Sequence, residues 1–314
     1  MRATILILAA ALVCGACTTS GKSDGEMAAE SDTSGGNESM ATGGSPEMAM
    51  NASGMGTAET RARTDRRLQL QRSLDQWWLA VQRQEYAKSD GLGTALEQFV
   101  NKHFDEIAED LTHANPRWRK IAAAGLGFSG RPQAVAPLES ALRDSDADVL
   151  VGALLSLGRL AEADVTIDAT KVTPFLSHSA PDIRSNAALV LVHATKKGQG
   201  ELYLPLTAAM EDHDAGVRVH VAAALGALGD PGAVPFLIRA MDDEKALVRI
   251  RAAYALARIG DQRAIPRLID AIDDPSIDVS RASHKSLRVL TGQDFERRRE
   301  AWAAYWNSRQ HQGS

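Results

Sequence analysis

The feature that most constrains this chain is an internal repeat of about 31 residues in its second half. The segments 222–243 and 252–274 share one frame, in which Gly229 and Gly260 stand 31 positions apart. The segment 122–144 follows the same frame, and two weaker copies lie between it and the others. A period of about 31 to 34 residues with two helical patterns per unit predicts a solenoid. One such unit cannot bury its own apolar face, whereas a stack of units can.

Each position of the repeat has a physical role. Glycine follows the first helix, where a C-cap residue suits it. Pro235 and Pro266 open the second helix, where a missing N–H costs nothing. Alanines in the first helix let successive helices approach closely. An i, i+3, i+4 apolar stripe predicts the buried side of each second helix: Leu138, Ala141 and Leu142; Leu206, Ala209 and Met210; Leu237, Ala240 and Met241; Leu268, Ala271 and Ile272.

Charged residues also recur in the frame. Arginines precede the alanines, and aspartates occupy the turns: Arg184, Arg218 and Arg249, with Asp182, Asp214, Asp243 and Asp274. One interpretation is an anion site. The favoured one is a ladder of bidentate Arg–Asp pairs that links adjacent repeats.

The pattern VR..AA.AL..IGD..AIP.L..A..D resembles the HEAT-like repeats first described in phycobilisome lyases. The resemblance covers residues 114–290 in five to six copies, and it is poorest over 147–179. It implies an all-α chain folded as an α–α superhelix, a HEAT-like or armadillo-like solenoid. It implies no single function, because such modules serve many.

Both ends of the array are expected to be capped. Residues 61–113 carry two apolar helical stripes, which predict an N-terminal helical hairpin with Trp77 and Trp78 in its core. The arginines before Leu68 are interpreted as a solvated helix start. The segment 291–314 resembles the "TGQDF … W" ending of such arrays. It predicts a C-terminal capping helix with Trp302, Tyr305 and Trp306 on one face and Arg297 to Arg299 toward solvent.

The first residues have the pattern of a targeting segment. Arg2 precedes an apolar run of about 11 residues, which is too short to span a bilayer. Small residues then precede Cys17 and polar residues follow it, which resembles a bacterial lipoprotein signal. The alternative is an ordinary secretory signal with two incidental cysteines. We expect residues 1–16 to be a signal peptide and Cys17 to carry the lipid. In lipoproteins an Asp after this cysteine favours the inner membrane, so Thr18 implies the outer membrane.

Residues 17–60 have a composition that cannot bury enough apolar surface to fold, so they predict a disordered tether. The tether holds Lys22 against seven acidic residues, a balance of −6, whereas the whole chain has a net charge of −5. The folded body is therefore nearly neutral, which makes nucleic acid an unfavourable partner.

Three sequence patterns have part of the spacing of known ligand-binding motifs. GLGFSG (125–130) has the glycine spacing of a dinucleotide motif but follows an alanine-rich helix rather than a strand. DSDAD (144–148) and DHDAG (212–216) lack the later ligands of a calcium loop and are interpreted as helix caps. The scattered histidines are not followed by glutamate, as they are in HEAT-type di-iron enzymes. We therefore expect a non-enzyme with no metal, cofactor or small-molecule substrate.

These features favour a membrane-tethered scaffold that binds another protein of the cell envelope. The alternatives are a bilin-lyase-type tetrapyrrole enzyme, which the resemblance suggests, and an envelope spacer or assembly factor. The hypothetical partner-binding surface lies on the second helices and comprises Glu139, Arg143, His178, Glu211, Arg239, Asp242, Arg267, Asp270 and Asp273.

Overall fold

The computed structural model describes residues 46–312, with side chains for residues 58–311. Within this range every regular element is a helix, and no strand occurs. The chain begins with α1 (Pro46–Gln82), α2 (Tyr86–Lys102) and α3 (Phe104–Asp110). Helix α1 starts inside the segment expected to be a tether. The expected signal peptide, Cys17 and the remainder of the tether lie outside the described residues.

The repeats consist of long helices that alternate with short ones. The long helices are α4 (Pro116–Leu126), α6 (Ala147–Glu162), α7 (Pro181–Ala194), α9 (Ala215–Leu228), α11 (Ala246–Ile259) and α13 (Ile277–Thr291). The short helices are α5 (Val135–Ala141), α8 (Tyr203–Ala209), α10 (Val234–Ala240) and α12 (Ile265–Asp270), followed by the terminal α14 (Arg299–Gln312). In the repeat that matches the sequence pattern least, the 3-10 turns η3 (Ala169–Lys171) and η4 (Thr173–Ser177) replace the short helix.

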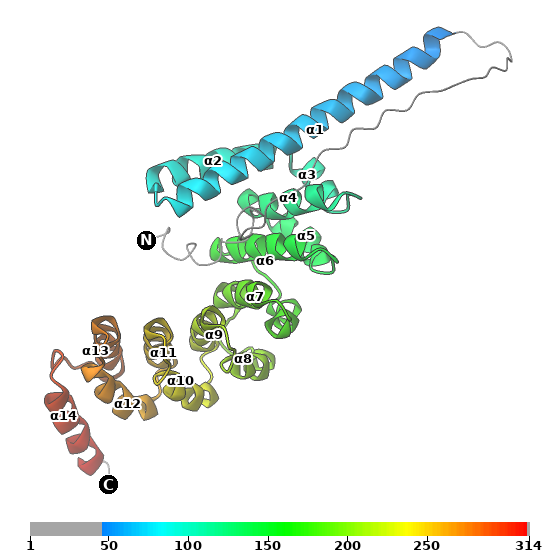
Figure 1. Cartoon of the computed structure of the whole chain (residues 1–314). Helices are drawn as coiled ribbons and strands as arrows, with labels where there is room; N and C mark the ends of the chain where they lie inside the picture. The colour runs from blue at the N-terminus through cyan, green and yellow to red at the C-terminus, as the bar shows by residue number, and fades with distance from the viewer. Residues whose placement is uncertain (1–45, 313–314) are drawn as a thin grey trace, which may run out of the picture.

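The solenoid is curved, and its two rows of helices occupy opposite sides of the curve. Figure 1 shows the long helices stacked side by side along the inner side, with α8, α10 and α12 along the outer side. We call these the inner row and the outer row. Successive long helices contact one another along their lengths, whereas successive short helices do not pack closely on each other.

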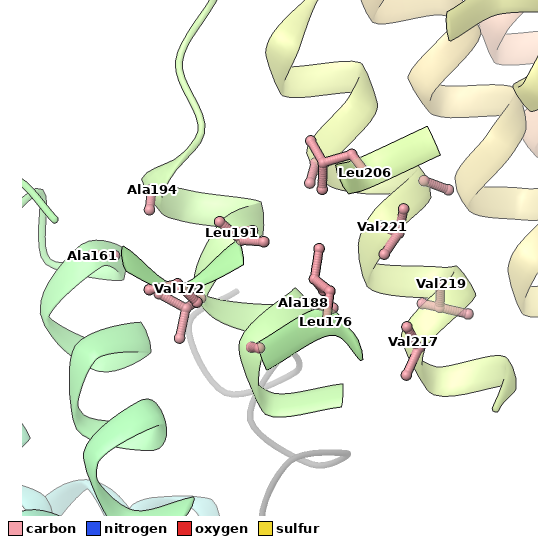
Figure 2. Packing of buried hydrophobic residues seen from close by; sticks show 14 of the residues in the cluster. Ala161, Val172, Leu176, Ala188, Leu191, Ala194, Leu206, Val217, Val219 and Val221 are labelled. Atoms are coloured by element: carbon pink, nitrogen blue, oxygen red, sulfur yellow. The ribbon is translucent and has the colours of Figure 1, made fainter. Parts of the chain in front are cut away.

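The core runs between the two rows. The predicted apolar stripe of the short helices is buried in all four units. In the repeat without a short helix, Val172 and Leu176 of the 3-10 segment join the same buried cluster as Ala188 and Leu191 of α7 (Figure 2). A poor local match to the repeat therefore leaves the core continuous, because two apolar side chains still fill the place of the stripe.

The turns follow the predicted chemistry. Gly229 and Gly260 end α9 and α11 in the left-handed region, with φ of 68° and 84°. Asp146 and Asp214, from the two calcium-like patterns, cap α6 and α9 by accepting hydrogen bonds from backbone N–H groups. Both predictions are confirmed.

Small residues set the spacing of the inner row. A Cβ added to Gly226 of α9 would lie 2.8 Å from the Cα of Ala255 in α11. In the GLGFSG segment, a Cβ on Gly127 would lie 2.6 Å from the Cα of Ser156 in α6, and the Gly127 N–H donates to the Ser156 hydroxyl. The backbones of neighbouring long helices therefore touch at these glycines. Because the outer row has no such contacts, the stack bends toward the inner row.

The N-terminal helices are held together by arginines, so the expectation that these arginines face solvent is wrong. Arg67 donates two hydrogen bonds of 2.6 and 2.7 Å to the Asp110 carboxylate, and Arg63 donates a third of 2.7 Å. Arg66 pairs with Glu106 at 2.7 Å. Asp110 is buried. Fixed guanidinium groups thus hold α1 against α3 at the start of the array.

The C-terminal segment folds as helix α14, which packs on the array. Trp302 is fully buried, and its indole N–H donates to the Glu296 carbonyl at 2.8 Å. Arg297 and Arg299 are exposed, as predicted. Arg299 also pairs with Asp270 at 2.7 Å, and this ion pair ties α14 to α12.

We predict that Gly226→Ala destabilises the solenoid although alanine favours helices. The new methyl group would overlap the α11 backbone, and overpacking of this kind costs about 1–3 kcal/mol. Gly158→Ala in α6 is the matched control, because its Cβ would meet Val190 at an ordinary 3.7 Å. The control should be neutral or up to about 1 kcal/mol more stable. Urea unfolding followed by helical circular dichroism measures both, and equal stabilities would refute the close contact.

Candidate interaction surface

An ion-pair ladder runs along the turns between repeats. In one rung, Arg218 donates from Nε and Nη2 to the two carboxylate oxygens of Asp243, at 2.7 and 3.0 Å. Its Nη1 donates to the Asp212 carbonyl at 2.7 Å, in the turn before its own helix. The Asp243 carboxylate also accepts the N–H of Lys245 at 2.8 Å. Each such arginine therefore links two successive turns. This ladder was predicted from the sequence, and the bidentate geometry confirms it.

The partners differ from the prediction in part. The rungs are Arg119–Asp144, Arg184–Asp212, Arg218–Asp243 and Arg249–Asp274. The assignment of Asp182 and Asp214 to the ladder was wrong. Asp182 lies in the first turn of α7 and Asp214 is the N-cap of α9. The aspartates that form the rungs lie in the turn before a helix begins. Arg119 was overlooked, although it stands four residues after Asn115 as Arg218 stands four after Asp214.

One rung is absent, and its absence explains His178. Leu150 occupies the arginine position of α6, so no cation is available there. The aspartate position of the next turn holds His178, whose Nδ1 accepts the N–H of Ala180 at 3.1 Å. An aspartate oxygen makes the same contact in the four turns of the ladder, and the Nδ1 of His113 makes it in the turn before α4, where it accepts the Asn115 N–H at 2.9 Å. His178 was expected near the end of a second helix, but it lies directly after η4 and shapes the turn.

Most of the hypothetical partner-binding residues form a second, outer set of ion pairs. Arg239 pairs with Glu211 at 2.8 Å and Arg267 with Asp242 at 2.7 Å, each joining a short helix to the turn after the preceding short helix. Glu139 pairs with Lys171 at 2.5 Å, Arg299 contacts both Asp270 and Asp273, and Arg143 is exposed. These residues lie on the outer row, and their charges are largely matched within the molecule.

The inner row presents a different surface, which the sequence analysis did not identify. Tyr254 of α11 is 40% exposed, and Leu247 and Val289 are also exposed. The Lys285 ammonium of α13 lies 5.6 Å from the centre of the Tyr254 ring. This contact places the exposed faces of α11 and α13 on one surface. The sequence pattern predicts only that these helices stack, and no local signal indicates that they line the inside of a curve.

Comparison with known proteins agrees with this architecture. The family model described as HEAT repeats matches residues 104–191, 167–254 and 203–288. These matches together cover more than half of the chain. The chain belongs to the HEAT-repeat family.

Solved structures of similar fold share little sequence with this HEAT-repeat protein. A designed armadillo repeat protein in complex with the peptide (KR)4 has 16% identity and a TM-score of 0.49, covering 59% of this chain and 98% of its own. Human deoxyhypusine hydroxylase has 22% identity and a TM-score of 0.37, covering 69% and 84%. The complex of CpcE and CpcF of phycocyanin lyase from Nostoc has 19% identity and a TM-score of 0.46, covering 59% and 76%. No curated protein matches the chain in sequence.

Among residues 46–312, no cluster of three or more histidine, cysteine or acidic side chains is arranged to hold a metal ion. No helix in the described range has the length and apolar character needed to cross a bilayer.

The inner row of this HEAT array also contains a buried histidine. His220 of α9 is 8% exposed, and its Nδ1 has no hydrogen-bond partner among the described residues. Burial lowers the pKa of His220 to about 4, and the charge of Arg251 acts in the same direction. Asp214 opposes the shift and His193 adds to it. His220 is therefore neutral at physiological pH.

We predict that Asp243→Ala lowers the free energy of unfolding by about 3 kcal/mol. The substitution leaves the largely buried Arg218 guanidinium without its carboxylate. Arg239→Ala is the control, because it removes the exposed outer pair with Glu211, worth at most about 1 kcal/mol. Urea unfolding at neutral pH gives both values. If the two variants lose equal stability, the ladder pair stabilises the protein no more than the exposed pair does.

We predict that acidification to pH 5 destabilises the protein through His220. Its folded pKa lies below the unfolded value of about 6.5, so the unfolded chain binds more protons between pH 6.5 and 4. Stability therefore falls as pH drops through this window, by about 2 kcal/mol between pH 7 and 5. Unfolding of the protein and of His220→Leu at both pH values tests this. Between pH 7 and 5, His220→Leu should lose about 2 kcal/mol less stability than the unsubstituted protein. An equal loss of stability in both proteins would contradict the assignment of this pH dependence to His220.

Proposed function

We propose that this protein is a non-catalytic, membrane-tethered scaffold that binds another protein of the cell envelope through the inner row of its HEAT array. The observation that carries the proposal is the gathering of exposed apolar side chains on one surface of a rigid frame. Leu247, Tyr254 and Val289 lie on α11 and α13, while the core beneath them is fully packed. Exposed apolar groups interspersed with polar ones are typical of protein-binding surfaces.

The rigidity of the frame supports this function. The ladder fixes each turn to the next, and the glycine contacts fix the spacing of the inner helices. A surface built on such helices keeps its side chains in place before a partner arrives, which lowers the entropy lost on binding.

The membrane tether is part of the proposal and rests on the sequence. The apolar run before Cys17, the small residues at positions 15 and 16 and the polar stretch that follows support a lipid anchor on Cys17. Two or more acyl chains would hold the protein stably at a membrane. Thr18 favours the outer membrane as its location. The acidic segment after it would separate the HEAT array from the bilayer.

The outer ion pairs remain a second candidate surface. Their charges are matched within the chain, and exposed pairs of this kind contribute little stability. A partner could exchange them for its own charges at small cost. Charge reversal at Arg239 and Asp270 tests this surface separately.

The experiment is crosslinking in intact cells that express a tagged copy, followed by mass spectrometry of what is captured. We predict one discrete envelope protein, whose capture weakens in Cys17→Ala. Charge reversal on the inner row at Arg258 should reduce capture, whereas reversal at Arg239 should not. No reproducible partner in either the anchored or the unanchored protein would contradict the scaffold proposal. Loss on reversal at Arg239 alone would move the binding surface to the outer row.

A further inference from the structure

Three cations on the inner row have no carboxylate partner. In the described part of the chain, no ion pair joins a carboxylate to Arg251, Arg258 or Lys285. In contrast, the ladder arginines and most charges of the outer row are matched. The sequence of α11, ALVRIRAAYALARI, contains three arginines and no acidic residue, and only Arg249 belongs to the ladder. Single unpaired cations such as Arg143 and Arg297 also occur elsewhere on the described surface, but on α11 and α13 three of them lie around one exposed aromatic ring.

We define the inner basic patch as Arg251, Tyr254, Arg258 and Lys285. Its charges surround an exposed aromatic ring, over which Lys285 already lies. Leu247 and Val289 border the patch and are exposed. On α13, Asp278 is matched by Arg281 at 3.2 Å, so it does not neutralise the patch. The patch combines unpaired cations with exposed apolar side chains. A complementary binding partner would carry carboxylates together with apolar side chains.

We infer that the inner basic patch binds an extended acidic segment of the partner protein, with two carboxylates three residues apart. This inference rests on the proposed function and specifies the chemistry of the partner. Packed helices lie about 8–10 Å apart, and three residues of an extended chain span about 10 Å. One carboxylate would pair with the arginines of α11 and the next with Lys285 of α13. The intervening side chains would contact Tyr254.

The extent of the patch favours a peptide over a nucleic acid. Its cations come from two neighbouring helices, whereas nucleic-acid binding relies on many phosphate contacts along a longer track. Nearer the N-terminus of the inner row, Lys120 is already matched by Asp148 at 2.8 Å. The bordering apolar residues also suit amino-acid side chains rather than a sugar–phosphate backbone.

Fluorescence anisotropy with the purified full chain tests the inference. The probe is a labelled twelve-residue peptide of serine and leucine that carries two aspartates three positions apart. The matched peptide has asparagine at both positions. We expect the aspartate peptide to bind at low salt and to weaken as salt rises, with little binding of the asparagine peptide. Arg258→Glu and Lys285→Glu should each weaken binding about tenfold or more, and Arg239→Glu on the outer row should not.

Several results would overturn the inference: equal binding of the two peptides, an equal effect of Arg239→Glu, or tighter binding of a single-stranded oligonucleotide than of the aspartate peptide. Thermal melts of each variant show that the fold is retained. The crosslinking experiment distinguishes a failure of the scaffold proposal from a failure of the acidic-segment inference. If a partner is captured in cells and its capture is unchanged by Arg258→Glu and Lys285→Glu, the scaffold proposal stands and the acidic-segment inference fails.

Discussion

The close approach of successive long helices is the contact on which the rest of this structure depends. At Gly226 and Gly127 the backbone of one helix meets the backbone of the next with no room for a side chain. Packing of this kind brings the inner row closer together than the outer row. The curvature follows from this difference, and so does the existence of an inner surface. A larger residue at these positions would separate the helices and flatten the array.

The ladder of arginines and aspartates lies in the turns and also fixes how successive repeats are arranged. Each guanidinium donates to the carbonyls of the turn before its own helix and to the carboxylate of the turn after it, as Arg218 does. Its planar fork tolerates little variation in angle, so it sets the rotation of one repeat relative to the next. Where Leu150 interrupts the ladder, the short helix is also replaced by 3-10 turns. The least regular repeat therefore departs from the others both in its secondary structure and in its ion pairs, although its core is continuous.

The two rows differ in how their charges are satisfied. On the outer row, pairs such as Arg239–Glu211 match charge between neighbouring repeats. On the inner row, the C-terminal helices leave cations unmatched beside an exposed tyrosine, while His220 is buried and held neutral. A nearly neutral body can therefore still present a locally basic, partly apolar surface, since what a partner meets is the local arrangement of charge rather than its sum.

The sequence by itself determined the repeat, the caps, the buried stripe and most of the ladder. These depend on residues within one unit or at a constant offset between units, so a periodic pattern records them. Only the tertiary structure decided which row faces inward, that Arg63, Arg66 and Arg67 hold the N-terminal hairpin, and that His178 stands in for a ladder aspartate. The direction of curvature arises from small differences in spacing summed over many helices. No single position carries that information, so the surface that the curve creates could not be located before the fold was known.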